Sequence, residues 1–110
     1  MGARSFLFLT VPPTNRAPIF LEQGTEAVKQ MGTDIAEYNS QLKEFVRAFQ
    51  ANHSDLGTIV FDTQPLFNVL LDEGQTLGFV NVTGYCAAYI NGTPTLTYQV
   101  EGCAPVSSYL

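Results

Sequence analysis

The sequence predicts an α/β protein with a short parallel sheet. Two apolar runs have the composition of buried strands, SFLFLTV at residues 5–11 and TIVFD at residues 58–62. A segment with helical spacing follows each of them, and strand, helix, strand, helix is typical of a right-handed α/β unit. We therefore expect a β–α–β–α unit over residues 1–74 and a loop-rich segment over residues 75–110.

The first run lies close to the N-terminus, where an apolar stretch can also be a signal peptide. Only one basic residue, Arg4, precedes it, and its apolar core is at the short end of the range for signals. Pro12 and Pro13 follow it without a small-residue cleavage pattern, and neither can donate a hydrogen bond to a sheet. These features favour a strand, buried on both faces in the middle of a parallel sheet.

Residues 34–50 form the first predicted helix. Asp34 and Glu37 resemble a capping box at its start, and Lys43 and Arg47 lie toward its C-terminal end. The segment AVKQM just before it predicts a short additional helical turn. The apolar residues at three- and four-residue steps are Ile35, Tyr38, Leu42, Phe45, Val46 and Phe49.

The second strand ends at Asp62, and the segment PLFNVLLDEG predicts the helix that follows. Pro65 suits the first turn of this helix and Gly74 its end. Asp62 stands where ligand sites form in α/β sheets, at the carboxyl end of a strand. Its commonest role at such a position is to hold the loop that follows.

Composition excludes several classes of partner and cofactor. A net charge of −5 with five basic residues argues against a nucleic-acid surface, and no apolar run approaches the ~20 residues that span a bilayer. The chain has one histidine, His53, in a polar turn after the first helix, so it lacks a ligand set for a metal. No glycine-rich phosphate loop is present, and we expect no cofactor.

The last third of the chain carries the chain's two cysteines, Cys86 and Cys103. They are either two unrelated thiols or a disulfide, which would contribute about 3 kcal/mol in the chain-entropy model. Three glycosylation sequons, at Asn52, Asn81 and Asn91, fall in predicted loops. Together these features favour a disulfide and an extracellular, glycosylated protein.

A set of short motifs along the whole chain resembles the later part of the GDSL (SGNH) serine ester hydrolases. The pattern is most similar to the fungal, secreted acetylesterases of carbohydrate-esterase family 16. The motif residues are Gly2-Ala3-Arg4, Phe6, Pro12-Pro13, Pro18, Tyr38-Asn39, Leu42, Asp62, Gly78-Phe79, Asn81-Val82-Thr83 and Cys86.

This resemblance implies a three-layer α/β/α sandwich with a mostly parallel sheet, here incomplete. It also implies acyl-transfer chemistry, in which a histidine activates a serine and preorganised donors hold the oxyanion. The family places these groups in G-D-S, G-x-N-D and D-x-x-H blocks, and none of the three occurs in this sequence. We therefore assign no catalytic residue and expect an inactive segment of such an enzyme.

Two functions follow from these expectations. The chain is either a segment of a secreted esterase that acts on esters or acetylated carbohydrate, or a non-catalytic remnant that binds carbohydrate or protein. In both cases the carboxyl ends of the two strands would line a cleft. The residues expected there are Pro13, Thr14, Asn15 and Asp62.

Overall fold

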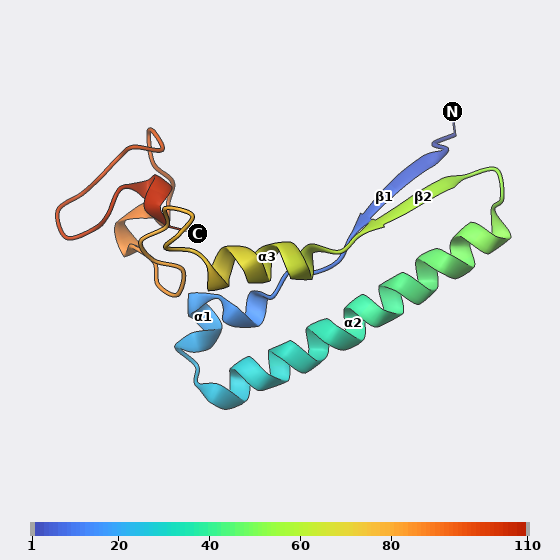
Figure 1. Cartoon of the computed structure of the whole chain (residues 1–110), viewed down its shortest axis with the longest axis horizontal. Helices are drawn as coiled ribbons and strands as arrows, with labels where there is room; N and C mark the ends of the chain where they lie inside the picture. Colours follow the sequence, from blue (N-terminus) through green and yellow to red (C-terminus); the bar gives the residue numbers. More distant parts are fainter. Residues whose placement is uncertain (1, 110) are drawn as a thin grey trace.

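The structure, a computed structural model, describes residues 2–109. Its strands are β1 (Ser5–Leu9) and β2 (Gly57–Phe61), and its helices are α1 (Pro18–Leu21), α2 (Thr25–Asn52) and α3 (Thr63–Asp72). Three short 3-10 turns complete it, η1 (Thr14–Arg16), η2 (Ala87–Tyr89) and η3 (Val106–Ser108). Figure 1 shows the strands and α2 side by side at one end and the C-terminal segment at the other.

The two strands form a parallel sheet, which confirms the predicted α/β class. Ser5 pairs with Gly57 and Leu9 with Phe61, and α2 makes the connection between the strands. Both carboxyl ends therefore meet at one edge, which we call the carboxyl edge. The predicted strand at residues 5–11 is shorter in the structure. The N–H of Thr10 still donates to the carbonyl of Phe61, but the N–H of Val11 donates to the side chain of Asn39 and not to a strand.

The helix between the strands is longer than predicted. α2 is a continuous helix of 28 residues. The segment AVKQM is therefore helical as predicted but belongs to α2, and the capping box at Asp34 and Glu37 is wrong. Gly24, with a φ of 94°, is the N-cap, and no proline interrupts the helix after it. Asp34 lies inside the helix, where its carboxylate accepts a hydrogen bond from Gln30 at 2.8 Å.

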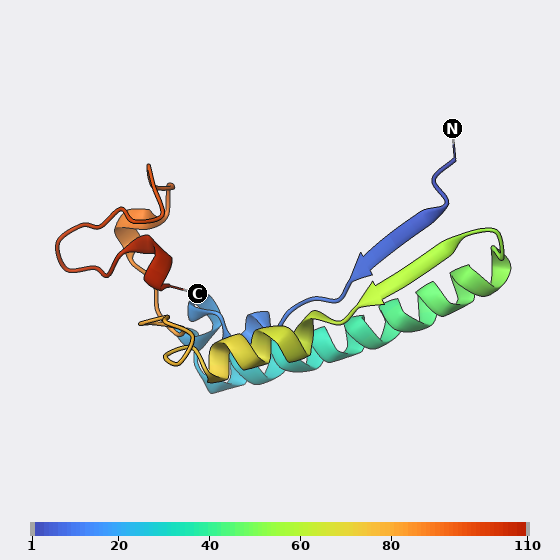
Figure 2. The same cartoon turned by 45° about the horizontal axis from the view of Figure 1, so that its top comes forward.

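The sheet is covered on one face by α2, as Figure 2 shows. Phe6 on that face meets Phe49 of α2 edge-on, with ring centroids 5.7 Å apart. On the opposite face Leu7 is 63% exposed and Ile59 66% exposed. The predicted burial on both faces is therefore wrong, because no element of residues 2–109 covers the second face.

The helical apolar pattern corresponds only in part to burial. Ile35 and Val46 are buried, whereas Tyr38 and Phe45 of the predicted stripe are exposed. Cys86 and Pro13 are also buried. The radius of gyration is 18.0 Å, against about 13 Å for a compact domain of this length. The described chain is thus elongated and has a small core.

The helix predicted over PLFNVLLDEG is observed as α3, with bounds close to the predicted ones. α3 begins at Thr63, two residues before Pro65, which still lies in the first turn as predicted. Gly74 follows the helix and is packed against Val82, where an added Cβ would lie 2.4 Å from a methyl carbon. None of the described helices is long and apolar enough to cross a bilayer.

The C-terminal segment contains the predicted disulfide. Cys86 and Cys103 are bonded, with their Cα atoms 6.1 Å apart. Tyr89 lies inside the loop that the disulfide closes, and its hydroxyl donates at 2.7 Å to the carbonyl of Ala104, which directly follows that loop. Apart from short 3-10 turns and one isolated bridge, the described part of this segment has no regular secondary structure.

Candidate functional site

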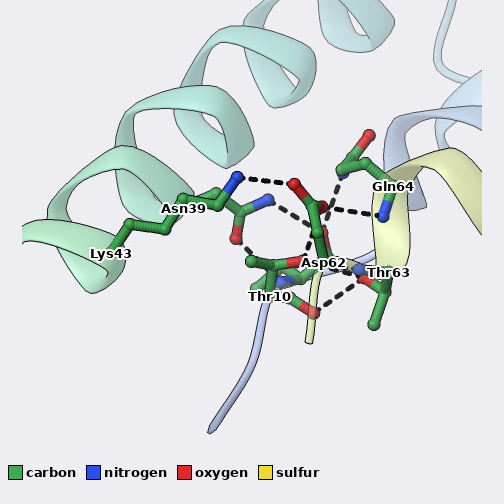
Figure 3. A network of polar contacts seen from close by, with 7 residues as sticks. Thr10, Asn39, Lys43, Asp62, Thr63 and Gln64 are labelled. Atoms are coloured by element: carbon green, nitrogen blue, oxygen red, sulfur yellow. Dashed lines mark hydrogen bonds and ion pairs between the residues drawn. The ribbon is translucent and has the colours of Figure 1, made fainter. Parts of the chain in front are cut away.

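Two threonines hold the ends of the strands together at the carboxyl edge. Thr10 follows β1 and Thr63 begins α3, and both are buried. The backbone N–H of Thr63 donates to Oγ1 of Thr10 at 2.9 Å, and Oγ1 of Thr63 donates to the carbonyl of Thr10 at 2.9 Å. The two segments that leave the sheet are therefore locked to each other by reciprocal hydrogen bonds (Figure 3).

Asn39 of α2 binds the backbone that follows β1. Its Oδ1 accepts from the N–H of Val11 at 2.8 Å, and its Nδ2 donates to the carbonyl of Val11 at 2.9 Å. The side chain of Gln64 donates to the same carbonyl at 2.8 Å. The Asn39 amide thus makes the two backbone hydrogen bonds that a neighbouring strand would make to Val11. Asn39 is only 6% exposed, so water could not easily make these bonds in its place.

Asp62 connects both helices to this edge. It is the N-cap of α3, where its Oδ1 accepts from the N–H of Gln64 at 3.2 Å. Its Oδ2 accepts from Nζ of Lys43 of α2 at 2.5 Å, and Thr10 also donates to it. The Lys43 hydrogen bond is the main cause that lowers the pKa of Asp62 below its ordinary value, so this carboxylate is charged at neutral pH.

A cavity of about 540 Å³ lies beside the network, between η1, α2 and the first turns of α3. Of the residues predicted to line a cleft, Pro13 and Asn15 line this cavity, whereas Thr14 lines a second one of about 160 Å³. Asp62 is not among the residues that line either, but it holds Lys43, which does. The full lining of the larger cavity is Pro13, Asn15, Arg16, Gly32, Ile35, Ala36, Asn39, Ser40, Lys43, Gln64 and Asn68.

Arg16 joins the loop after β1 to α3. Its guanidinium donates to Asn68 at 2.9 Å and to Asp72 at 2.6 Å. The sequence assigned no interaction partner to either Arg16 or Asp72. Ion pairs between segments far apart in the chain have no signature in local sequence.

Asn39 also had no assigned role, although it belongs to the Tyr38-Asn39 motif. A usable signal was present, because Ile35, Asn39 and Val46 lie on one helical face. A polar residue at a core-facing helical position predicts a specific hydrogen-bond partner. The position was visible in the sequence, whereas its partner Val11 was not.

His53 lies away from this site. It is the C-cap of α2, and α2 ends beside the start of β2, at the edge of the sheet opposite the network. The ring is exposed and packs on Phe49, with centroids 4.8 Å apart. Within residues 2–109 no group of three histidine, cysteine or acidic side chains could hold a metal ion.

The three sequon asparagines have different environments. Asn91 is exposed in a loop, as predicted, but Asn52 is the last residue of α2 and not a loop residue. α2 extends two residues past its predicted end at residue 50 and so includes Asn52. Oδ1 of Asn81 accepts from the N–H groups of Thr83 and Gly84 at 3.0 and 2.7 Å, so its amide is held by a turn.

Known proteins similar to this chain include named esterases. The chain is 32% identical over 85 residues to an acetylesterase of Thermothelomyces thermophilus, covering 76% of this chain and 28% of the relative. It is 30% identical over 114 residues to a GDSL esterase/lipase of Arabidopsis thaliana, covering 97% and 30%. It is 28% identical over 98 residues to a thermolabile hemolysin of Vibrio parahaemolyticus, covering 89% and 23%.

No family model matches the chain. The similarity nevertheless extends over 76% to 97% of its residues, while the chain spans only 23% to 30% of the length of these relatives. The comparisons confirm what the motifs indicate: this chain resembles a segment of the GDSL-type ester hydrolases.

Proposed function

We propose that the chain is a structural segment of a GDSL-type serine ester hydrolase that acts on acyl or acetyl esters of carbohydrate or lipid. The observation that carries this proposal is the similarity to an acetylesterase and to a GDSL esterase/lipase over most of the chain. The parallel sheet supports it, because ligands of α/β proteins bind outside the carboxyl ends of the strands.

In this proposal the chain's part is to hold the carboxyl edge in shape. Ester hydrolysis requires a nucleophile, a base and oxyanion donors held within a fraction of an ångström of the productive geometry. The contacts of Asn39 with Val11, and of Thr10 with Thr63, fix the backbone of both segments that leave the sheet. These residues would act by positioning and would not touch the reacting atoms.

A chimera tests the proposed role. This chain replaces the matching segment of the Thermothelomyces thermophilus acetylesterase, and release of acetate from 4-nitrophenyl acetate is measured. We expect turnover, and we expect Asn39→Ala in the chimera to lower kcat more than Gln41→Ala, a control on the exposed face of α2. A chimera that folds with a cooperative melting transition but shows no turnover would contradict the proposal.

The isolated chain is proposed to be catalytically silent, because its sequence contains none of the family's catalytic blocks. We expect no more acetate release than an equal amount of unrelated protein gives, and no change with His53→Ala. Turnover above that background, lost with His53→Ala or after a serine-directed organophosphate, would refute the expectation and indicate an unrecognised active site.

We also propose that the protein is extracellular and glycosylated. The disulfide and the three sequons support this proposal. The solvent exposure of the three asparagines indicates which of them should be glycosylated most fully. Asn91 and Asn52 are exposed, whereas Asn81 is half-buried and held by its turn. After secretion from a eukaryotic host, treatment with peptide N-glycosidase should convert Asn91 and Asn52 to aspartate, as mass spectrometry would show, with less conversion at Asn81.

A further inference from the structure

The turn at residues 89–92 contains an asparagine whose side-chain amide is not held in place. Asn91 is exposed, and within residues 2–109 its side chain makes no hydrogen bond. Asn81 differs, because its Oδ1 accepts from the N–H groups of Thr83 and Gly84. The Asn91 amide can therefore rotate toward the backbone that follows it, whereas the Asn81 amide is fixed by its turn.

The backbone that follows Asn91 is open to such an approach. Of the six asparagines in the sequence, Asn91 is the one that precedes a glycine. Gly92 has a φ of 90°, and nothing lies within 4 Å of the position where an added Cβ would stand. Because glycine has no side chain, its own backbone nitrogen stays unshielded. The Gly92 nitrogen can thus reach the side-chain carbonyl carbon of Asn91.

We propose that Asn91 is a site of spontaneous deamidation. The backbone nitrogen of Gly92 attacks Cγ of Asn91 and gives its proton to the solvent, while the side-chain nitrogen leaves as ammonia. The bond formed closes a five-membered succinimide ring, and water opens this ring at either carbonyl to give aspartate or isoaspartate. One water molecule is taken up for each ammonia released. Each event adds one negative charge to a chain whose net charge is −5.

The turn slows this reaction without preventing it. The N–H of Gly92 donates to the carbonyl of Tyr89 at 3.0 Å, so the attacking nitrogen must first leave this hydrogen bond. The turn lies inside the loop that Cys86 and Cys103 close, and the Tyr89 hydroxyl is bonded to Ala104 just after that loop. Reduction of the disulfide should therefore raise the deamidation rate about three- to tenfold, as for the release of one neutral hydrogen bond.

Asn52 provides a matched comparison within the same chain. It is also exposed, and the N–H of the next residue, His53, donates to the carbonyl of Gln50 at 3.3 Å, in the same arrangement as Gly92 with Tyr89. His53 carries a side chain beside the attacking nitrogen, so Asn52 should deamidate more slowly than Asn91. The variant His53→Gly should make Asn52 a second reactive site, whereas the control His53→Ala should not.

Peptide mapping of the full chain tests the proposal. The chain is produced in a bacterial host without glycosylation and incubated at neutral pH. We expect the Asn91 peptide to be the first to gain the mass of deamidation and to be labelled by an isoaspartyl methyltransferase. The variant Asn91→Gln should lack this first event, because glutamine would have to form a six-membered ring.

Three outcomes would overturn the proposal. They are earlier reaction at another asparagine, no isoaspartyl labelling of the Asn91 peptide, or equal stability of Asn52 in His53→Gly and His53→Ala. Because the bacterial chain carries no glycan, these outcomes are independent of the proposed glycosylation. In the secreted chain, peptide N-glycosidase in water labelled with heavy oxygen would mark former glycan sites, whereas an Asn91 that had deamidated earlier would carry ordinary oxygen.

Discussion

The two parts of this chain are held together in different ways. Residues 5–72 form the β–α–β–α unit. At its carboxyl edge, side-chain hydrogen bonds join residues far apart in the chain, such as Val11 with Asn39, 28 positions apart, and Thr10 with Thr63, 53 positions apart. Residues 73–109 have little regular structure and depend on one disulfide and a cluster of tyrosines around Tyr89. The first part is organised by tertiary polar contacts, whereas the second is organised by a covalent link.

The two parts also expose apolar surface for different reasons. In the unit, Leu7, Leu9, Ile59 and Phe61 are exposed together on one face of a parallel sheet, which is normally covered on both faces. Other apolar side chains of the unit are exposed on its helices. In the C-terminal segment the exposed side chains are scattered over loops, which is ordinary for surface apolar residues. On the sheet face the pairs Leu7–Ile59 and Leu9–Phe61 place exposed apolar side chains side by side, and contiguous apolar surface promotes association.

The largest expected effect is therefore on self-association. The chain should bind a hydrophobic dye and elute as species larger than a monomer, and the double variant Leu7→Thr/Ile59→Thr should reduce both. Threonine retains strand propensity, so the sheet itself should persist. The control Ile90→Thr/Leu96→Thr removes comparable apolar area from the C-terminal segment and should change neither measurement. A monomeric chain that shows no dye binding would contradict this expectation.

Reduction of the disulfide should affect the stability of the two parts differently. Loss of the Cys86–Cys103 bond should cost about 3 kcal/mol of stability in the segment that it closes. Hydrogen exchange should accelerate for the amide of Val100 inside that segment and for the amide of Val106, which donates to the carbonyl of Tyr98 in it. The amides of Val11 and Thr63 should keep their protection. Equal acceleration in both parts would show that they unfold as one unit.

Asn39→Ala is the corresponding change in the first part. It leaves the N–H of Val11 without a partner and the carbonyl of Val11 with Gln64 alone, which should cost about 1–3 kcal/mol in local opening free energy. Exchange of the Val11 amide should rise roughly five- to hundredfold, while the disulfide-closed segment is unchanged. Unaltered protection at Val11 would mean that Asn39 does not hold this loop.

The smallest expected effect is that of pH on the Lys43–Asp62 pair. Because folding lowers the pKa of Asp62, the pair stabilises the folded chain above the unfolded pKa of about 4, and this stabilisation is lost as pH falls through the lowered value. Both side chains are partly exposed, so the contribution should stay below about 1 kcal/mol.

The variant Asp62→Asn checks this effect. It should remove that part of the pH dependence of Thr63 amide exchange between about pH 5 and pH 2, whereas the control Asp55→Asn should leave that part in place. Asp55 is paired with Arg4 at a more exposed position. An unchanged pH profile in Asp62→Asn would show that the pair has no energetic role.

The sequence by itself determined the α/β class, both strands, the second helix, the cysteine pairing and the resemblance to ester hydrolases. These features depend on local pattern, on turn residues such as Pro65 and on short motifs, all of which are written in consecutive residues. The start of α2 was predicted too late, because Asp34 and Glu37 have the residue types and the three-residue spacing of a capping box. The backbone before them was helical already, so their side chains had no free N–H groups to cap.

Only the tertiary structure decided which residues form the site. Asn39 meets Val11, Arg16 meets Asp72 and Lys43 meets Asp62 because the parallel crossover brings α2 and the loops of the carboxyl edge together. The tertiary structure also decided that one face of the sheet is exposed, because no described element packs over Leu7 and Ile59. An apolar strand sequence states what a side chain prefers, whereas burial depends on whether another element packs over it.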